Sequence, residues 1–85
     1  MIYVVSDDED HFLGQVKFEI LKDIAVISIS ISPDFRGRGL GRYVLKSACE
    51  KFHIERPDIK EIEAIIRPSN LPSIKIFEYA GFKYK

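Results

Sequence analysis

A run of glycines and arginines near the middle of the chain has the residue types of an anion-binding loop. It follows a turn through Pro33 and reads Arg36-Gly37-Arg38-Gly39-Leu40-Gly41. Glycines at alternate positions let the backbone approach a ligand closely, and the first N–H groups of a helix have no partner within the helix. Because the positive end of the helix dipole stands behind those groups, the loop predicts a site for a phosphate or pyrophosphate.

The residues on either side predict the elements that position this loop. A strand is expected over 24–32, with three isoleucines toward a core (Ile27, Ile29 and Ile31) and three serines on its other face. An amphipathic helix is expected over 39–53, with Leu40, Tyr43, Val44, Ser47, Ala48 and Phe52 at helical spacing. A further strand over 59–66 would then run parallel to the first through a right-handed crossover. The serine face has two equally weighted interpretations: a wall of a ligand cleft or a plain exposed face.

Two antiparallel strands are predicted before this unit and one helix after it. Residues 2–6 and 12–20 are rich in strand formers and flank an acidic hairpin tip; the second strand alternates, with Phe12, Gly14, Val16, Phe18 and Ile20 inward. Asn70 is a good N-cap, Pro72 suits a first turn and Gly81 a stop, which predicts a helix over 71–80 and a strand from 82. The fold class is therefore α/β (α+β), a mixed sheet.

The composition limits the kinds of partner that the chain is expected to bind. The chain has 85 residues, 46% hydrophobic and 31% charged, with a formal net charge of zero, and its basic residues form no stripe, so no nucleic acid partner is expected. No apolar run is long enough for a membrane span, and a single cysteine, Cys49, excludes an internal disulfide. A cytoplasmic protein is expected. His11 and His53 have no partner at metal-ligand spacing, so no metal site is predicted.

Two motifs in this order resemble the GNAT superfamily of N-acetyltransferases. The first is the glycine loop after an apolar strand, which matches the pattern Arg/Gln-x-x-Gly-x-Gly/Ala of the coenzyme A pyrophosphate loop in that superfamily. The second runs from Asn70 to Phe82 and looks like the later motif Asn-x-x-Ala/Ser-x-x-x-aromatic-x-x-x-Gly-Phe with each spacing intact. The resemblance covers nearly the whole chain, which is expected to form one domain over residues 1–85.

The resemblance implies acetyl-CoA as co-substrate and a primary amine of an amino sugar, protein or small molecule as acceptor. Backbone groups of Ile29 and Ile31 would lie against pantetheine, the amides from Arg36 to Arg42 would surround the pyrophosphate, and Asn70 would reach a pantetheine amide. The implied cofactor-binding residues are therefore Ile29, Ile31, Arg36, Gly37, Arg38, Gly39, Leu40, Gly41, Arg42, Asn70, Ser73 and Phe77. In this family a deprotonated amine attacks the thioester directly, backbone amides polarise its carbonyl, and a side chain often protonates the leaving thiolate.

The sequence departs from the family pattern in three places. The position of the usual tyrosine proton donor holds Phe77, and Tyr79 is not expected to replace it, since it lies about 160° away around a helix. Instead Tyr79 is expected beside Lys75 at the edge of the buried face. No acidic residue on the strand over 24–32 offers a base, so the catalytic residues are unassigned. The elements at both ends of the family fold are also expected to be missing, which would leave sheet edges open to a homodimer partner.

Other functions remain as alternatives to an active transferase. A non-catalytic acyl-CoA-binding or regulatory module fits the short chain and the absent proton donor. A dinucleotide site fits less well, because its fingerprint Gly-x-Gly-x-x-Gly differs from the spacing of Gly37, Gly39 and Gly41. A nucleoside triphosphatase fits least, since no lysine followed by serine or threonine closes the loop.

Overall fold

The fold is taken from a computed structural model of the chain, which describes residues 1–35, 37 and 39–83. In chain order its elements are β1 (Ile2–Ser6), β2 (Phe12–Leu21), β3 (Ile24–Ile31), the short 3-10 helix η1 (Pro33–Phe35), α1 (Leu40–Glu55), β4 (Glu61–Ala64) and α2 (Leu71–Tyr79). Among these described residues, no helix is long and apolar enough to cross a membrane.

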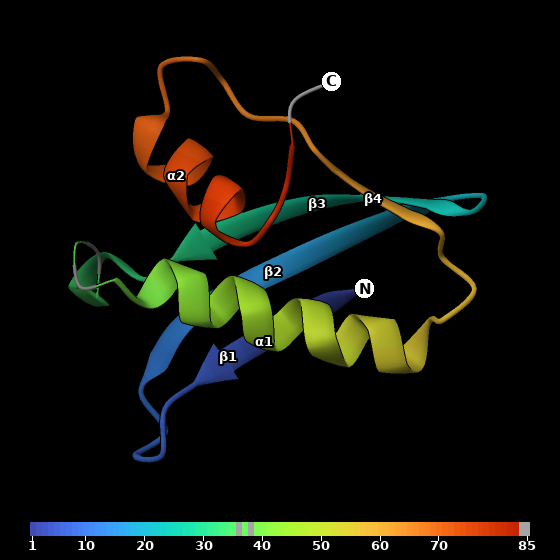
Figure 1. Ribbon diagram of the computed structural model, residues 1–85. Coiled ribbons are helices and arrows are strands. Elements are labelled where there is room, and N and C mark those ends of the chain that lie inside the picture. Colours follow the sequence, from blue (N-terminus) through green and yellow to red (C-terminus); the bar gives the residue numbers. More distant parts are fainter. Residues whose placement is uncertain (36, 38, 84–85) are drawn as a thin grey trace.

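The four strands form one mixed sheet in the order β1-β2-β3-β4. β1 and β3 each pair antiparallel with β2, and β4 pairs parallel with β3. The parallel pair requires a crossover, and α1 supplies it by running across one face of the sheet (Figure 1). The predicted mixed α/β fold with an antiparallel start, a β-α-β crossover and a C-terminal helix is therefore confirmed.

The core lies between α1 and the inner face of the sheet. Phe18 of β2 and Phe52 of α1 stack with ring centres 3.9 Å apart, and Tyr3 of β1 meets both rings edge-on at 5.8 and 6.5 Å. Stacked and edge-on pairs are favourable arrangements for aromatic rings, and each buries a large apolar area. This aromatic cluster packs the C-terminal part of α1 against β1 and β2.

The inward face predicted for β2 is wrong at its first residue. Phe12 is exposed, whereas Leu13 is buried beside Gly14. The pairing of β1 with β2 shifts between Val5 and Ser6, so that Val5 faces Gly14 while Ser6 faces Phe12. An extra residue in one strand reverses the alternation of side chains beyond it, which the sequence pattern alone does not reveal.

Three other predictions differ from the structure. On α1, Tyr43 is exposed and Leu45 is buried in its place, since the buried face is centred on Val44, Ala48 and Phe52. β4 is shorter than the predicted strand because its pairing with β3 stops at Ala64. The strand expected from residue 82 is absent over the described residues Phe82 and Lys83, while residues 84 and 85 lie outside them.

The acidic segment between β1 and β2 is the hairpin tip that the sequence predicts. The Asp7 carboxylate accepts hydrogen bonds from the backbone N–H groups of Glu9 and His11, both at 2.9 Å. Its second oxygen lies 3.0 Å from His11 Nδ1. These bonds hold the pKa of Asp7 below its usual value.

Candidate functional site: a cleft between two helix ends

The sheet opens next to the end of β3. The ladder between β3 and β4 ends at the pair Ile27 and Ala64, although β3 itself continues to Ile31. Beyond this pair the chain that follows β4 turns away and returns as α2, which lies near the end of β3 and the start of α1 (Figure 1). The last residues of β3 therefore form one wall of an open space, with α2 on the opposite side.

Two glycines shape the loop that closes this space. Gly37 and Gly39 have φ angles of 79° and 74°, in the left-handed region that side chains with a β-carbon rarely adopt. Gly39 is also the N-cap of α1, and it places no capping side chain over the first-turn N–H groups. The predicted anion-binding loop thus has the backbone form that its glycines allow. Arg36 and Arg38 lie outside the described residues.

The third glycine has a packing role. A β-carbon on Gly41 would overlap Ile76 Cδ1 of α2, so the absence of a side chain lets the two helices approach here. Gly41 is buried, although it is in the first turn of a helix. Ile76 of α2 therefore packs closely against the start of α1 at this point.

The result is a cleft of about 1050 Å³, hereafter the cleft. Its walls come from the end of β3, η1, the glycine loop, the first turn of α1 and one face of α2. Nine of the residues implied as cofactor-binding line it: Ile29, Ile31, Gly37, Gly39, Leu40, Gly41, Arg42, Asn70 and Ser73. The β3 serines Ser28 and Ser30 are both exposed, and Ser30 also lines the cleft.

Asn70 has a structural bond that limits what it can offer a ligand. Its Oδ1 accepts a hydrogen bond from the Ser73 backbone N–H at 3.3 Å, which confirms the predicted N-cap of α2. The acceptor side of the amide is therefore engaged, and the Nδ2 group is the part that can donate to a ligand carbonyl.

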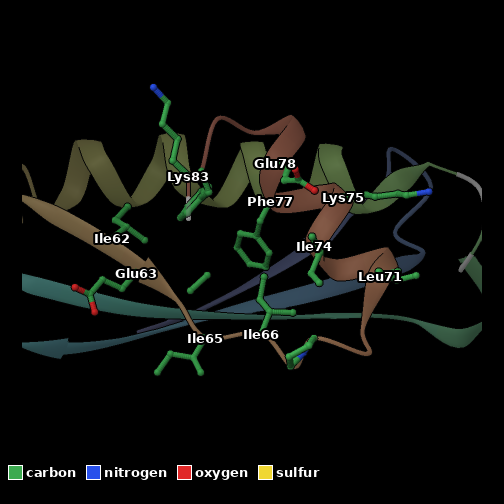
Figure 2. Close-up of a pocket in the computed structure, with 13 residues that line it drawn as sticks. Ile62, Glu63, Ile65, Ile66, Leu71, Ile74, Lys75, Phe77, Glu78 and Lys83 are labelled. Atoms are coloured by element: carbon green, nitrogen blue, oxygen red, sulfur yellow. The ribbon is translucent and has the colours of Figure 1, made fainter. Parts of the chain in front are cut away.

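Phe77 is placed away from the other implied residues. It is buried, contacts Phe82 edge-on at 5.0 Å, and lines a second hollow of about 610 Å³ instead of the cleft. Figure 2 shows Ile66, Ile74 and Phe77 converging on this second hollow, hereafter the groove, which runs between α2 and the chain of β4. Lys75 and Glu78 also line it.

The cleft carries positive charge only. Arg42 and Lys75 line it, and none of its described lining residues is an aspartate or glutamate. The first turn of α1 also contains no acidic residue. With the positive end of the α1 dipole added, the electrostatics favour a ligand with several negative charges.

Sequence reasoning missed one wall of the cleft. Pro72, Lys75, Ile76 and Tyr79 all line it from α2. Pro72, Ile76 and Tyr79 follow one another at spacings of four and three, which places them on one face of a helix. Tyr79 lies on this wall together with Lys75, as expected, but it is mostly exposed instead of at the edge of the buried face, and its ring lies against Arg42. The helical spacing was visible in the sequence; the direction in which that face points was not.

The remaining reactive side chains do not add chemistry to the cleft. Burial raises the pKa of the Cys49 thiol to about 11, so it is protonated at neutral pH. Among the described residues, no group of three or more His, Cys, Asp or Glu side chains could hold a metal ion.

The chain is similar to known proteins in sequence. The family described as "Acetyltransferase (GNAT) domain" matches residues 1–83. The [ribosomal protein bS18]-alanine N-acetyltransferase of Salmonella typhimurium is 30% identical over 63 residues, 74% of this chain and 41% of its own length. YwnH of Bacillus subtilis, named as a candidate phosphinothricin acetyltransferase, is 31% identical over 87 residues, 95% of this chain and 52% of its own length.

Solved structures show the same fold. The spermidine N-acetyltransferase of Vibrio cholerae, solved in complex with CoA and spermine, has a TM-score of 0.84 at 21% identity and covers 99% of this chain and 51% of its own. The ribosomal-protein-S18-alanine N-acetyltransferase of Escherichia coli has a TM-score of 0.79 at 20% identity, over 100% of this chain and 54% of its own.

The fold is that of the acetyltransferases in these solved structures. The chain belongs to the GNAT acetyltransferase family, as its sequence motifs predict. It spans about half the length of the curated relatives it matches.

Proposed function

We propose that this chain binds acetyl-CoA in the cleft and serves the transfer of the acetyl group to a primary amine. The observation that carries the proposal is the cleft itself: two left-handed glycines and an uncapped helix start face α2 across a space without described acidic residues. Family membership supports the same assignment. Residues 1–85 would act as one cofactor-binding domain.

The proposed contacts follow the walls of the cleft. The pyrophosphate would accept hydrogen bonds from the amides between Arg36 and Arg42, near the α1 dipole. The pantetheine arm would extend along β3 beside Ile29 and Ile31, past the point where the ladder with β4 ends. Asn70 would donate its Nδ2 group to a pantetheine carbonyl, since its Oδ1 is engaged by Ser73.

The chemistry is direct transfer. The neutral amine nitrogen would attack the thioester carbonyl, a C–N bond would form and the C–S bond would break. The nitrogen would lose one proton to solvent and the leaving thiolate would take up one proton from solvent, and no side chain is assigned to either transfer. The described lining residues of the cleft include no histidine, aspartate or glutamate, so no general base is assigned. The domain would thus contribute mainly by binding and orienting the thioester.

Acceptor candidates come from the relatives. Their names specify spermidine, phosphinothricin and the alanine of ribosomal protein bS18, all of which present an amine. We therefore propose a small-molecule or protein amine as acceptor. A cytoplasmic location is proposed with it, because a single cysteine is typical of a reducing compartment.

Calorimetry with CoA and with pantetheine tests the binding step. Pantetheine has the arm but no pyrophosphate, so it should bind at least about tenfold more weakly than CoA. Equal affinities would overturn the assignment of the pyrophosphate to the glycine loop. Acetyl transfer from acetyl-CoA to spermidine, phosphinothricin and an alanine-terminated bS18 peptide tests the second step. CoA binding without any transfer would favour the non-catalytic module.

We also propose that a second copy of the chain covers the groove and the outer edge of β4. β4 pairs on one side only in the described sheet, and the groove beside it is lined by Ile66, Ile74 and Phe77. Its lining includes charges of both signs, Lys75 and Glu78, which suits a two-fold contact in which each acid meets a lysine. Light scattering at micromolar concentration should report a dimer; a species of 9.8 kDa alone would contradict the proposal.

A further inference from the structure

One contact crosses the mouth of the cleft. The Arg42 guanidinium carbon lies 4.1 Å from the centre of the Tyr79 ring. Arg42 belongs to the first turn of α1 and Tyr79 is the last residue of α2. The contact therefore joins the two helix ends between which the cleft opens.

Core packing does not explain why a tyrosine occupies this position. Tyr79 is 72% exposed, and the buried residue of α2 is Phe77. An exposed aromatic ring adds little buried apolar area to the fold, but its face can attract a cation.

The geometry leaves the arginine able to bind. A guanidinium that stacks on a ring uses its flat face, whereas its five N–H donors point outward in its own plane. Among the described residues, no carboxylate forms an ion pair with Arg42, and the described lining of the cleft contains none. The stacked arginine thus keeps its donors for a ligand in the cleft.

A long, flexible arginine otherwise has to be ordered when the ligand arrives. Arginine is among the side chains that lose most rotamer freedom on being fixed. A ring that already holds the guanidinium reduces this cost at the moment of binding. Lys75, one helical turn before Tyr79 and also in the cleft, adds a second cation to the same wall.

We propose that Tyr79 is a positioning residue for Arg42: its ring holds the guanidinium across the mouth of the cleft, with the N–H donors turned to a phosphate group of the ligand. The inference rests on the proposed binding of CoA and assigns a residue to it. The aromatic ring of Tyr79 positions the guanidinium, and the Tyr79 hydroxyl is not needed for this.

A calorimetric double-mutant cycle tests this role. Arg42→Ala should weaken CoA binding at least about tenfold, and Tyr79→Leu about fivefold, the size of an exposed cation–π contact. Tyr79→Phe keeps the ring and should stay within about twofold of the parent protein. Once Arg42 is alanine, adding Tyr79→Leu should cost less than about twofold more, since the ring then has nothing to hold.

Two controls separate positioning from a structural role. Pantetheine has no phosphate, so its affinity should not change by more than about twofold in Tyr79→Leu. Tyr43→Leu removes a comparably exposed ring of α1 that does not line the cleft, and it should leave CoA binding unchanged.

The outcomes are distinguishable from a failure of the proposed function. If the parent protein does not bind CoA, the proposed function falls. If it binds CoA but the losses of Arg42→Ala and Tyr79→Leu add in the double variant, Tyr79 does not act through Arg42. Equal weakening by Tyr79→Phe and Tyr79→Leu, or a loss of pantetheine affinity, would also overturn the inference.

Discussion

Ile76 of α2 occupies the space beside Gly41 of α1 that a β-carbon would need. Such a carbon would lie 3.1 Å from Ile76 Cγ1 and would overlap Cδ1. Gly41→Ala should therefore push α2 away from α1 and lower the free energy of unfolding by about 1–2 kcal/mol, because overpacking outweighs the gain in helix propensity. Denaturant unfolding measures the stability, and calorimetry should show weaker CoA binding as the wall of the cleft moves.

Ile76→Val supplies the matched control, since it removes the Cδ1 atom that Gly41→Ala would meet. By itself it should cost about 0.5–1.5 kcal/mol. In the Ile76→Val background, Gly41→Ala should leave the free energy of unfolding unchanged or raise it. If Gly41→Ala destabilises equally in both backgrounds, the contact with Ile76 does not set the helix spacing.

Gly39 tests the backbone shape of the loop. Among the described residues, a β-carbon there would meet Arg42 Nη2 at 3.7 Å, an ordinary contact, but φ is 74°. Gly39→Val should reduce CoA affinity below detection while the circular dichroism spectrum is kept, because a β-branched residue strongly disfavours the left-handed region. Gly39→Asn is the comparison: asparagine tolerates that region and should retain most of the affinity. Equal losses in both variants would contradict this view of the loop.

The fold could be predicted where the signals are local. Alternation along β3, the Asn70 cap and the stop at Gly81 each depend on a few neighbouring residues, and the structure has β3, α2 and the Asn70 to Ser73 bond where expected. The glycine loop was recognisable for the same reason. Its arginines Arg36 and Arg38 lie outside the described residues, so their roles stay predictions.

Features that depend on register or on the approach of distant elements could not be predicted. The bulge at Leu13 turns the Phe12 side chain to the opposite face of the sheet, and it arises from the pairing of β1 with β2. β4 ends at Ala64 because the chain turns toward α2. The contact between Arg42 and Tyr79 needs the crossing of two helices that Gly41 and Ile76 fix. No short window of sequence contains that information.

The raised pKa of Cys49 predicts that its thiol reacts slowly with alkylating reagents. Burial raises its pKa from 9.0 to about 11, so at pH 8 the folded protein should be alkylated by iodoacetamide about 100-fold more slowly than the unfolded chain. Since the folded state holds this proton more tightly, the contribution to stability is constant below pH 9 and declines as the pH rises toward 11. Time-resolved mass spectrometry in buffer and in concentrated guanidinium gives both rates. Similar rates would mean that the thiol is accessible and ionised.

Tyr3 provides a test of the core. Its ring packs edge-on against Phe18 and Phe52, but its hydroxyl is buried without a hydrogen-bond partner among the described residues. Burial raises the pKa of Tyr3; the Glu55 carboxylate raises it further, although the two groups do not meet hydrogen-bond geometry. Because an unsatisfied buried polar group is unfavourable and phenylalanine keeps the ring contacts, Tyr3→Phe should raise the free energy of unfolding by about 1 kcal/mol.

Two further variants separate the hydroxyl of Tyr3 from its ring. Tyr3→Leu removes both edge-on contacts and should destabilise the protein relative to Tyr3→Phe by about 1–2 kcal/mol. Glu55→Gln removes the charge that faces the hydroxyl and should change stability by less than about 0.5 kcal/mol. A loss of stability in Tyr3→Phe that disappears when Glu55 is already alanine, which unlike glutamine offers no acceptor, would show that the hydroxyl donates to Glu55 in solution. The core would then contain a satisfied polar pair instead of an unpaired hydroxyl.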